Sequence, residues 1–398
     1  MHMPTRKRAY VETYGCQMNI SDGELMSGVL ASHGFDLVDT PHDADVVLVN
    51  TCAIREHAEQ RVLGRVAQLN GLKEKNPRLI IGVTGCMAQR MGEDLLRRAP
   101  YVDLVMGPDG YRHLPEALRA AASDQPTAPV SHPDLVPLTT SLRRGTRSLS
   151  VLKLDPAENY EGLELRRASS VSAWIPIQRG CNHRCTFCIV PSVRGPEKNR
   201  EPQAVLEEIG RLAQKGITEV TLLGQTVNSY RAEDWNFPRL LRSVAQIPGI
   251  RRVRFTSPHP MDVTHELVDV MAREEAVCEQ LHLPLQAGSD RTLKRMLRRH
   301  SVAEFLEKVE MIRTAVPDIA LSTDVIVAFP GETEEEFRDT LAVLREVRFD
   351  DAFTYRFSPR EGTPATRFPA KEIFPEAEGR ARLDELIEVT RGIQREIN

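Results

Sequence analysis

Short apolar runs alternate with amphipathic stretches over the first 122 residues of the chain. The runs have the length and β-branched content of buried strands, and the stretches carry the apolar spacing of helices. This pattern predicts strands at Ala9–Thr13, Asp45–Asn50, Leu79–Thr84 and Val102–Gly107. It predicts helices at Glu24–Ser32, Arg55–Leu72, Met91–Arg98 and His113–Ala122. The alternation indicates an N-terminal α/β domain, residues 1–122, with a parallel sheet and right-handed crossovers.

The same alternation returns after a polar connector, residues 123–171, in which Ser148–Leu154 and Gly162–Ser170 are candidate short strands. Six further strands are predicted at Trp174–Gln178, Glu219–Leu223, Arg252–Thr256, Gln280–Leu283, Ile319–Ala328 and Ala352–Phe357. Helices are predicted at Pro202–Lys215, Asp290–Arg298, Val302–Ala315 and Glu334–Val347. Six such units indicate an open, partial (βα)6 barrel, residues 172–375, followed by a charged helix at 376–398. The predicted fold class is therefore α/β throughout.

Composition narrows the class of protein. The chain has 398 residues, 41% of them hydrophobic, which is enough for the cores of two or three domains. It has no apolar run near the roughly 20 residues of a membrane span, and its N-terminus lacks the apolar stretch of a signal peptide. A cytoplasmic location is expected, where seven cysteines favour metal ligation over disulfides. The formal charge of −4 argues against general nucleic-acid affinity but leaves room for a local basic patch.

The strongest chemical signal is the C-x3-C-x2-C run of Cys181, Cys185 and Cys188. Three thiolates hold three corners of a four-iron cluster and leave one iron open to a small molecule. The run follows the first predicted barrel strand, at the rim where barrel active sites form. The alternative is a zinc site, for which His183 within the run would be the fourth ligand.

Three other cysteines occupy equivalent positions in the N-terminal domain. Cys16, Cys52 and Cys86 each lie just past the carboxyl end of a predicted strand. In a parallel sheet these ends meet at one edge, where α/β folds bind their ligands. The pattern predicts a second open cluster, and the alternative is that each cysteine is a small buried core residue.

An open iron at a barrel rim indicates S-adenosylmethionine as the small molecule. Its amino and carboxylate groups can chelate the iron, and an electron from the cluster then releases a 5′-deoxyadenosyl radical. Residues at the ends of the second, fourth and fifth barrel strands are the candidate cofactor contacts, namely Gln225, Gln286, Ser289, Asp324 and Phe329.

These motifs resemble a known family. The segments Tyr14–Asn19, Asn50–Glu56 and Thr84–Cys86 are similar to the methylthiotransferase N-terminal domain, and Cys181–Cys188 resembles the radical S-adenosylmethionine domain that follows it. Ser358–Ala365 resembles a late motif of the same family, so that the resemblance covers nearly the whole chain. Within the family, Asn50–Ala58 is similar to the tRNA-modifying MiaB branch.

The resemblance implies a reaction. The substrate would be tRNA carrying N6-isopentenyladenosine immediately 3′ to the anticodon. The radical would remove hydrogen from C2 of that adenine, and a cluster on Cys16, Cys52 and Cys86 would supply the sulfur, methylated by a second S-adenosylmethionine. The cofactors would be two [4Fe–4S] clusters and S-adenosylmethionine. A flavodoxin or ferredoxin would supply electrons, the protein would be a monomer, and no membrane would be involved.

The resemblance also implies a C-terminal RNA-binding TRAM domain that would begin about where this sequence stops, so we expect either a truncated chain or a protein that lacks this domain. We expect weak tRNA binding with the chemistry retained. Candidate RNA contacts are basic residues at helical offsets 0, 3, 4 and 7, namely Arg291, Lys294, Arg295 and Arg298, with a solvated helix face as the alternative. Two other functions are compatible with the motifs: a RimO-like methylthiotransferase acting on a ribosomal protein, and a non-catalytic Fe–S protein that binds RNA.

Overall fold

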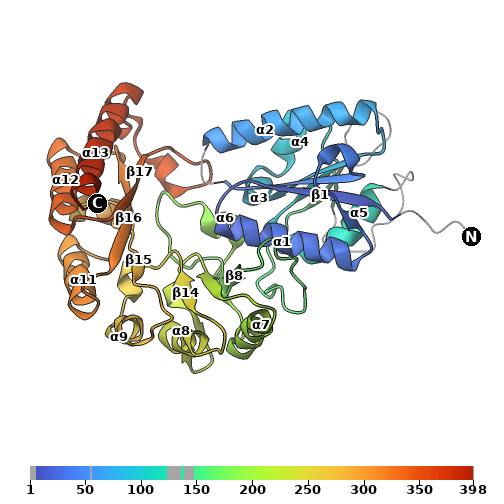
Figure 1. Ribbon diagram of the computed structural model, residues 1–398. Coiled ribbons are helices and arrows are strands. Elements are labelled where there is room, and N and C mark those ends of the chain that lie inside the picture. The colour runs from blue at the N-terminus through green and yellow to red at the C-terminus, as the bar shows by residue number, and fades with distance from the viewer. Residues whose placement is uncertain (1–5, 54–55, 123–135, 139–147, 398) are drawn as a thin grey trace, which may run out of the picture. The chain divides into compact units, whose positions relative to one another are not determined.

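The computed structural model describes residues 6–53, 56–122, 136–138 and 148–397 (Figure 1). The chain forms two compact units. The first comprises Met1–Ser169 and Ser192–Lys198, and the second comprises Ser170–Pro191 and Asn199–Asn398. The latter part of the predicted connector thus belongs to the first unit, and so does a short segment of the predicted barrel domain.

A seven-stranded sheet forms the centre of the first unit, in the order β2-β1-β3-β4-β5-β7-β6. All neighbouring strands are parallel except β6 and β7. The four predicted strands are confirmed, and so is one short strand in the predicted connector, but Gly162–Ser170 is not a strand. The strands are β1 (Arg8–Thr13), β2 (Asp36–Leu37), β3 (Val46–Thr51), β4 (Ile80–Gly85), β5 (Leu104–Met106), β6 (Val136–Leu138) and β7 (Ser148–Val151).

The helices of the first unit differ from the prediction at two places. The first begins at Gln17 rather than Glu24, because its early turns bury the polar residues Asn19 and Asp22 and carry no apolar periodicity. The predicted helix Met91–Arg98 is two helices separated by Gly92, whose φ is +51°. The helices are α1 (Gln17–Ser32), α2 (Glu56–Asn70), α3 (Cys86–Met91), α4 (Glu93–Arg98) and α5 (Leu114–Ala121).

Both faces of this sheet are covered. On β3, Val46 and Leu48 are buried in the cluster that includes α1 and α5, while Val47 and Val49 belong to the cluster that includes α2, α3 and α4. Figure 1 shows these helices on either side of the strands. A strand with both faces buried reads as a continuous apolar run, which is why β3 could be predicted from the sequence.

The second unit is an open barrel of six parallel strands, all of which were predicted. One sheet has the order β14-β11-β8 and another the order β15-β16-β17. A parallel bridge between Val253 and Val277 connects β14 to the residues that lead into β15. The strands are β8 (Ser172–Pro176), β11 (Glu219–Leu223), β14 (Arg252–Phe255), β15 (Gln280–His282), β16 (Ala320–Val327) and β17 (Asp351–Arg356), with the shorter β9 (Gln178–Arg179), β10 (Lys198–Asn199), β12 (Arg231–Ala232) and β13 (Trp235–Asn236).

Helices alternate with these strands. The predicted bounds of α11 and α12 are confirmed, and each helix begins with a capping box that satisfies its first backbone N–H groups. The predicted helix Asp290–Arg298 is wrong at its end: α10 stops at Arg295, and Leu297 adopts a left-handed φ of +55°. The remaining elements are α6 (Val190–Arg194), α7 (Pro202–Gln214), α8 (Phe237–Ala245), α9 (His265–Arg273), α10 (Asp290–Arg295), α11 (Val302–Ala315), α12 (Glu334–Val347) and α13 (Glu376–Ile397).

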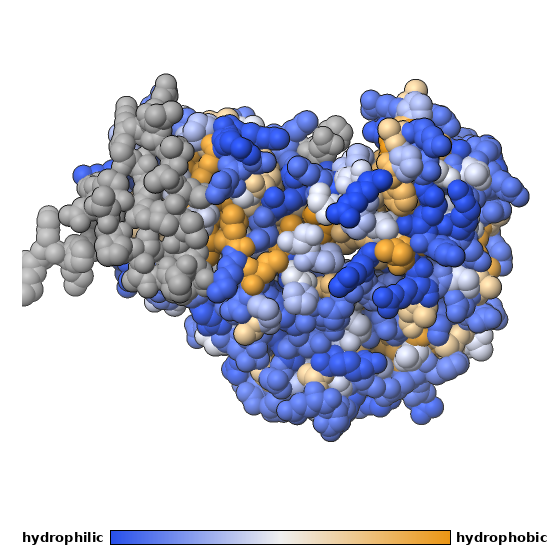
Figure 2. All heavy atoms as spheres, turned by 180° about the vertical axis from the view of Figure 1, so that it is seen from behind, coloured by the Kyte–Doolittle hydropathy of each residue, from blue (hydrophilic) through white to orange (hydrophobic). Residues whose placement is uncertain are grey.

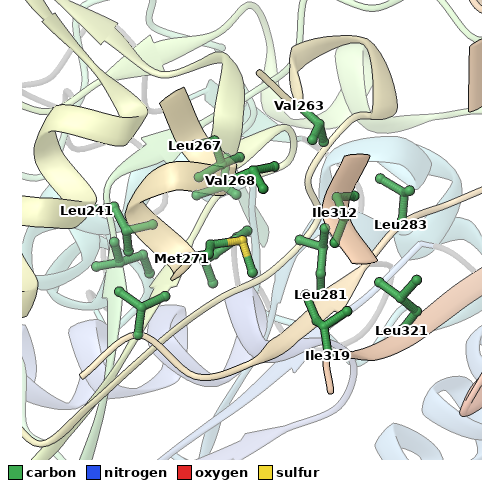
Figure 3. Packing of buried hydrophobic residues seen from close by; sticks show 14 of the residues in the cluster. Leu241, Val263, Leu267, Val268, Met271, Leu281, Leu283, Ile312, Ile319 and Leu321 are labelled. Atoms are coloured by element: carbon green, nitrogen blue, oxygen red, sulfur yellow. The ribbon is translucent and has the colours of Figure 1, made fainter. Parts of the chain in front are cut away.

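The core of the second unit lies between these helices and the strands. In Figure 3, Leu267 and Met271 of α9 lie near Leu281 of β15, with Leu321 of β16 on the far side. Each fully buried side chain of this size stabilises the fold by roughly 1.5–3 kcal/mol. In Figure 2 the lower region, where α7, α8 and α9 lie, is covered almost entirely by hydrophilic residues. Among the described residues no helix is long and apolar enough to span a bilayer.

Candidate metal centres and cofactor site

The three N-terminal cysteines follow three neighbouring strands of the first sheet. Thr13 at the end of β1 is in register with Asn50 of β3, which is in register with Thr84 of β4. Cys16 then precedes α1, Cys52 follows β3, and Cys86 is the first residue of α3. Cys16 and Cys52 are hydrogen-bonded, and the charge of Cys16 acts on Cys86. The structure therefore brings this cysteine group together at one sheet edge, as the strand pattern predicted.

Two glycines make this close approach possible. A Cβ atom on Gly15 would lie 2.5 Å from the Cβ of Cys52. A Cβ atom on Gly85 would lie 2.5 Å from both the Asn50 Oδ1 and the Thr51 carbonyl oxygen. Both glycines also have positive φ, +131° and +91°. Only glycine allows this conformation and this spacing together, so the Gly-Cys dipeptides are structural requirements of the cysteine group.

A buried asparagine pair fixes the loops that carry the first two cysteines. Asn50 Nδ2 donates to the backbone oxygen of Asn19 at 2.7 Å, and Asn19 Nδ2 donates to the Thr51 carbonyl at 3.1 Å. The Sγ of Cys16 donates to Asn19 Oδ1 at 3.3 Å. Both asparagines are fully buried. Because each amide has partners on the neighbouring loop, the pair sets the separation between α1 and the end of β3.

Sequence reasoning missed a charged residue in this group. Arg194, the last residue of α6, donates from Nε to the Sγ of Cys86 at 3.2 Å and forms a 2.6 Å ion pair with Asp22 of α1. The arginine is 2% exposed. One signal in the sequence could have indicated this residue. Asp22 lies four residues before the apolar Met26, so both lie on the same buried helix face, and a buried carboxylate requires a positively charged partner.

These surroundings separate the pKa values of the thiols. The pKa of Cys16 is lowered to about 6, chiefly by the hydrogen bond with Cys52 and further by the positive charge of Arg194, against the effect of burial. Burial raises the pKa of Cys86, and Arg194 opposes that rise. Metal ligation requires thiolates, so the positive charge favours the form that binds iron.

The barrel cysteines lie in the loop after β9. Cys181 accepts a hydrogen bond from Thr226 Oγ1 at 3.6 Å, and Cys185 accepts one from Arg298 Nη1 at 3.7 Å. The N–H of Cys188 donates to the Cys185 carbonyl at 3.0 Å. Burial raises the pKa of Cys188 to about 12. The spacing therefore places three buried or half-buried thiols at the strand ends of the barrel, where the sequence predicted them.

The zinc alternative finds no support at His183. Its ring stacks on His259 with 4.1 Å between centroids, and its Nε2 lies 3.8 Å from an oxygen of Asp262. Among the described residues, the potential metal-ligating group that contains His183 consists of these three residues and no cysteine. Burial lowers the pKa of His259 to about 2, so that its ring is neutral. None of the seven cysteines, all of them described, is in a disulfide.

Two predicted cofactor residues carry unsatisfied amide oxygens. Within the described part of the chain, the Oε1 atoms of Gln225 and Gln286 are buried without a hydrogen-bond partner. Gln225 lies just past the end of β11, and Gln286 lies four residues past the end of β15 with a φ of +69°. Buried acceptors are normally satisfied. These two atoms fit a ligand that carries N–H or O–H donors, such as the amino group of S-adenosylmethionine.

The other three predicted cofactor residues have protein partners. Ser289 Oγ donates to Glu336 Oε1 at 3.2 Å, and Asp324 lies 3.1 Å from the Nε2 of His282. Phe329 is fully buried in an apolar cluster with Phe357. Asp324 remains part-exposed, whereas Ser289 and Phe329 are buried.

The predicted basic helix face is not continuous. Arg291 pairs with Glu336 and Arg295 with Glu372, while Arg298 lies beyond the end of α10 and donates to Cys185. Lys294 is exposed. In the segment that distinguishes the MiaB branch, residues 54 and 55 lie outside the described residues, as do residues 123–135 and 139–147 of the predicted connector.

Two family models match the chain. The radical SAM superfamily matches residues 175–344, and the model described as uncharacterized protein family UPF0004 matches residues 8–107. Among solved structures, the radical S-adenosylmethionine methyltransferase TsrM from Kitasatospora setae is 15% identical with a TM-score of 0.63, covering 91% of this chain and 77% of that one. The cobalamin-dependent S-adenosylmethionine radical enzyme OxsB has a TM-score of 0.61 at 12% identity, covering 97% and 56%.

The fold and the cysteine run thus define a radical S-adenosylmethionine enzyme. Curated relatives show which family within this class the chain belongs to. A tRNA-2-methylthio-N(6)-dimethylallyladenosine synthase of Thermoanaerobacter sp. (strain X514) is 43% identical over 97% of this chain and 78% of that protein. The same enzyme of Chlorobium luteolum is 42% identical over 100% and 84%. The chain belongs to the tRNA-2-methylthio-N(6)-dimethylallyladenosine synthase family, which confirms the resemblance drawn from its motifs.

Proposed function

We propose that the protein adds a methylthio group to C2 of N6-isopentenyladenosine in tRNA, immediately 3′ to the anticodon. The observation that carries this proposal is the pair of cysteine groups, one at the rim of a radical S-adenosylmethionine barrel and one at the edge of the first sheet. The family relatives, named for this reaction, support the choice of substrate.

We assign each cysteine group one [4Fe–4S] cluster. The three barrel cysteines hold the cluster that binds S-adenosylmethionine, and the three N-terminal cysteines hold the cluster that donates sulfur. When bound, these groups supply one-electron cleavage of S-adenosylmethionine and a sulfur atom for transfer. Three thiolates per group fit this role because each leaves one iron without a protein ligand.

The chain's own residues orient the small molecule and shield it from water. The Oε1 atoms of Gln225 and Gln286 accept hydrogen bonds from S-adenosylmethionine, because both are buried acceptors without a partner among the described residues. Thr226 donates to Cys181 and Arg298 donates to Cys185, which stabilises these ligands as thiolates. Three further residues support the site indirectly. Ser289 contacts Glu336, Asp324 contacts His282, and Phe329 packs in the apolar cluster.

The anticodon stem-loop binds through positive charge. We assign Arg291, Lys294 and Arg295 to its phosphates, whereas Arg298 bonds to Cys185. Lys294 is the strongest contributor, because it is exposed while the other two pair with Glu336 and Glu372. Electrons come from a flavodoxin or ferredoxin.

The test begins with iron and sulfide analysis of anaerobically reconstituted protein. Wild type should hold about eight irons, and a Cys16/Cys52/Cys86→Ala triple variant about four. The variant should still cleave S-adenosylmethionine but transfer no labelled methylthio group to tRNA. Cys278→Ala is the matched control, since Cys278 lies outside both groups, and it should retain all the iron.

Three results would overturn the proposal. Equal iron content in wild type and triple variant would make the N-terminal cysteines core residues. Transfer of label to a ribosomal protein and not to tRNA would show a protein-modifying enzyme. Absence of S-adenosylmethionine cleavage in the wild type would leave a non-catalytic Fe–S protein.

A further inference from the structure

Arg194 contacts the N-terminal cysteine group, and one nitrogen of its guanidinium group, Nη1, has no partner among the described residues. Its Nη2 pairs with Asp22 at 2.6 Å, where the two side chains are 3% and 2% exposed, and its Nε donates to Cys86 at 3.2 Å. The third nitrogen, Nη1, is buried and has no hydrogen-bond partner among the described residues. Its segment, Ser192–Lys198, is part of the first unit, so all these contacts lie within that unit.

A buried guanidinium nitrogen without a partner is costly, because it has lost its hydrogen bonds to water and gained none in the protein. A second orphaned group lies nearby. The hydroxyl of Tyr111 is fully buried without a partner in the described structure, and burial, with the neighbouring negative charge of Asp22, raises its pKa well above the ordinary value, so that it stays a neutral donor. Two unsatisfied buried donors near Cys86 indicate a place prepared for an acceptor that carries negative charge.

We propose that Arg194 binds an anionic sulfur ligand, hydrosulfide or methanethiolate, at the iron–sulfur cluster held by Cys16, Cys52 and Cys86. This inference rests on the proposed function, which places a cluster on those cysteines. A four-iron cluster with three thiolates is negatively charged, and a further sulfur anion at its open iron increases that charge. Arg194 offsets it at two points: Nε–H stabilises the Cys86 thiolate, and Nη1 donates to the added sulfur.

The charge of Arg194 does not depend on pH in the useful range. The guanidinium group of arginine stays protonated in proteins because its ordinary pKa is above about 12. The guanidinium is therefore a fixed cation. A sulfur ligand that binds to it as an anion loses an attraction whenever the arginine is replaced by a neutral side chain.

The test uses full-length protein in which Cys181, Cys185 and Cys188 are replaced by alanine, so that only the N-terminal cluster is present. In this background Arg194→Met is combined with Asp22→Asn, which avoids leaving a buried carboxylate without a partner. The matched control is Lys198→Met with Asp109→Asn. The two side chains lie 2.7 Å apart and are 5% and 0% exposed, and Lys198 belongs to the same Ser192–Lys198 segment as Arg194.

Sodium hydrosulfide and sodium methanethiolate are titrated separately against the reduced cluster, and binding is followed by electron paramagnetic resonance. For at least one of the two anions, the Arg194 double variant should reach half-saturation at a concentration about tenfold or more above that of the parent, since it loses a charge-assisted hydrogen bond. Its midpoint potential should also fall, because the Cys86 thiolate loses a donor. The Lys198 control should match the parent in both. The anion whose affinity falls identifies whether the ligand is methylated.

Each other outcome decides the question. Unchanged affinity and potential in the Arg194 variant would overturn the proposal. Loss of iron in that variant alone would support it, because the cluster then needs the arginine. Equal loss in the control would overturn it, since the segment would serve only to anchor the chain. A parent protein without iron would refute the proposed function itself, and the role of Arg194 with it.

Discussion

Replacement of Gly85 by alanine tests whether backbone geometry builds the N-terminal cysteine group. Gly85 has φ +91° and ψ −161°, a region that only glycine occupies readily, so alanine costs about 1–3 kcal/mol in backbone strain. The added Cβ would also lie 2.5 Å from the Thr51 carbonyl oxygen, and backbone of a central strand cannot move away easily. Overpacking of this kind costs a further 1–3 kcal/mol or so.

The two contributions together predict a loss of roughly 2–6 kcal/mol in the free energy of unfolding of the first unit. Relief of the clash must also move β3 from β4 and so separate Cys52 from Cys86. We therefore expect lower iron occupancy of the N-terminal cluster in protein whose barrel cysteines are replaced by alanine. Urea unfolding of the iron-free protein and iron analysis after reconstitution measure the two effects.

Gly64→Ala is the matched control. Gly64 lies inside α2, and a Cβ there would have no heavy atom within 4 Å. Alanine at this position should stabilise the helix by about 0.5–1 kcal/mol and leave the iron content unchanged. If Gly85→Ala instead unfolds within 1 kcal/mol or so of wild type and keeps its iron, the argument from close approach is wrong.

Three further predictions concern single side chains. Burial raises the pKa of Glu332 to about 7 from an ordinary value near 4.5. The folded state therefore binds the extra proton, and this stability is present below about pH 4.5 and lost as pH rises to 7. Relative to Glu332→Gln, wild type should lose about 3 kcal/mol over that range in urea unfolding, and parallel pH profiles would contradict the pKa shift. Gly288→Ala should cost about 1–3 kcal/mol, because its Cβ would lie 2.5 Å from the Cα of Thr340; an unchanged thermal midpoint would refute this. Asn50→Leu should cost at least about 1–3 kcal/mol in urea unfolding by removing the buried hydrogen bonds between Asn50 and Asn19, and wild-type stability would show that the pair is dispensable.

The position of the cysteines could be predicted because it depends on topology alone. Strands of a parallel sheet end at a common edge, so a cysteine just after each of β1, β3 and β4 had to converge. Both β3 and β4 are buried on both faces, which gives an apolar run that is visible in the sequence. The barrel strands carry a different signal, since β16 alternates between buried and half-buried positions.

Residues whose role depends on distant partners could not be predicted. The contact between Arg194 and Asp22 joins positions 172 residues apart, and no local periodicity reports it. The end of α10 was placed too late because Leu297, an apolar residue at helical spacing, is 52% exposed in a left-handed turn. The start of α1 was missed because Asn19 and Asp22 are polar. They are buried because they bond to Cys16 and to Arg194, and so they do not contribute to an apolar helix pattern.

The discontinuous first unit has a consequence for biosynthesis. Asp22 leaves the ribosome 172 residues before Arg194, with which it forms a buried ion pair. At about 5–20 residues per second, that interval is roughly 9–34 s. Through that time the nascent sheet lacks the cation that balances its buried carboxylate and reaches Cys86. The first domain of the chain to emerge can therefore complete its charge balance only after the Cys181–Cys188 loop has been translated.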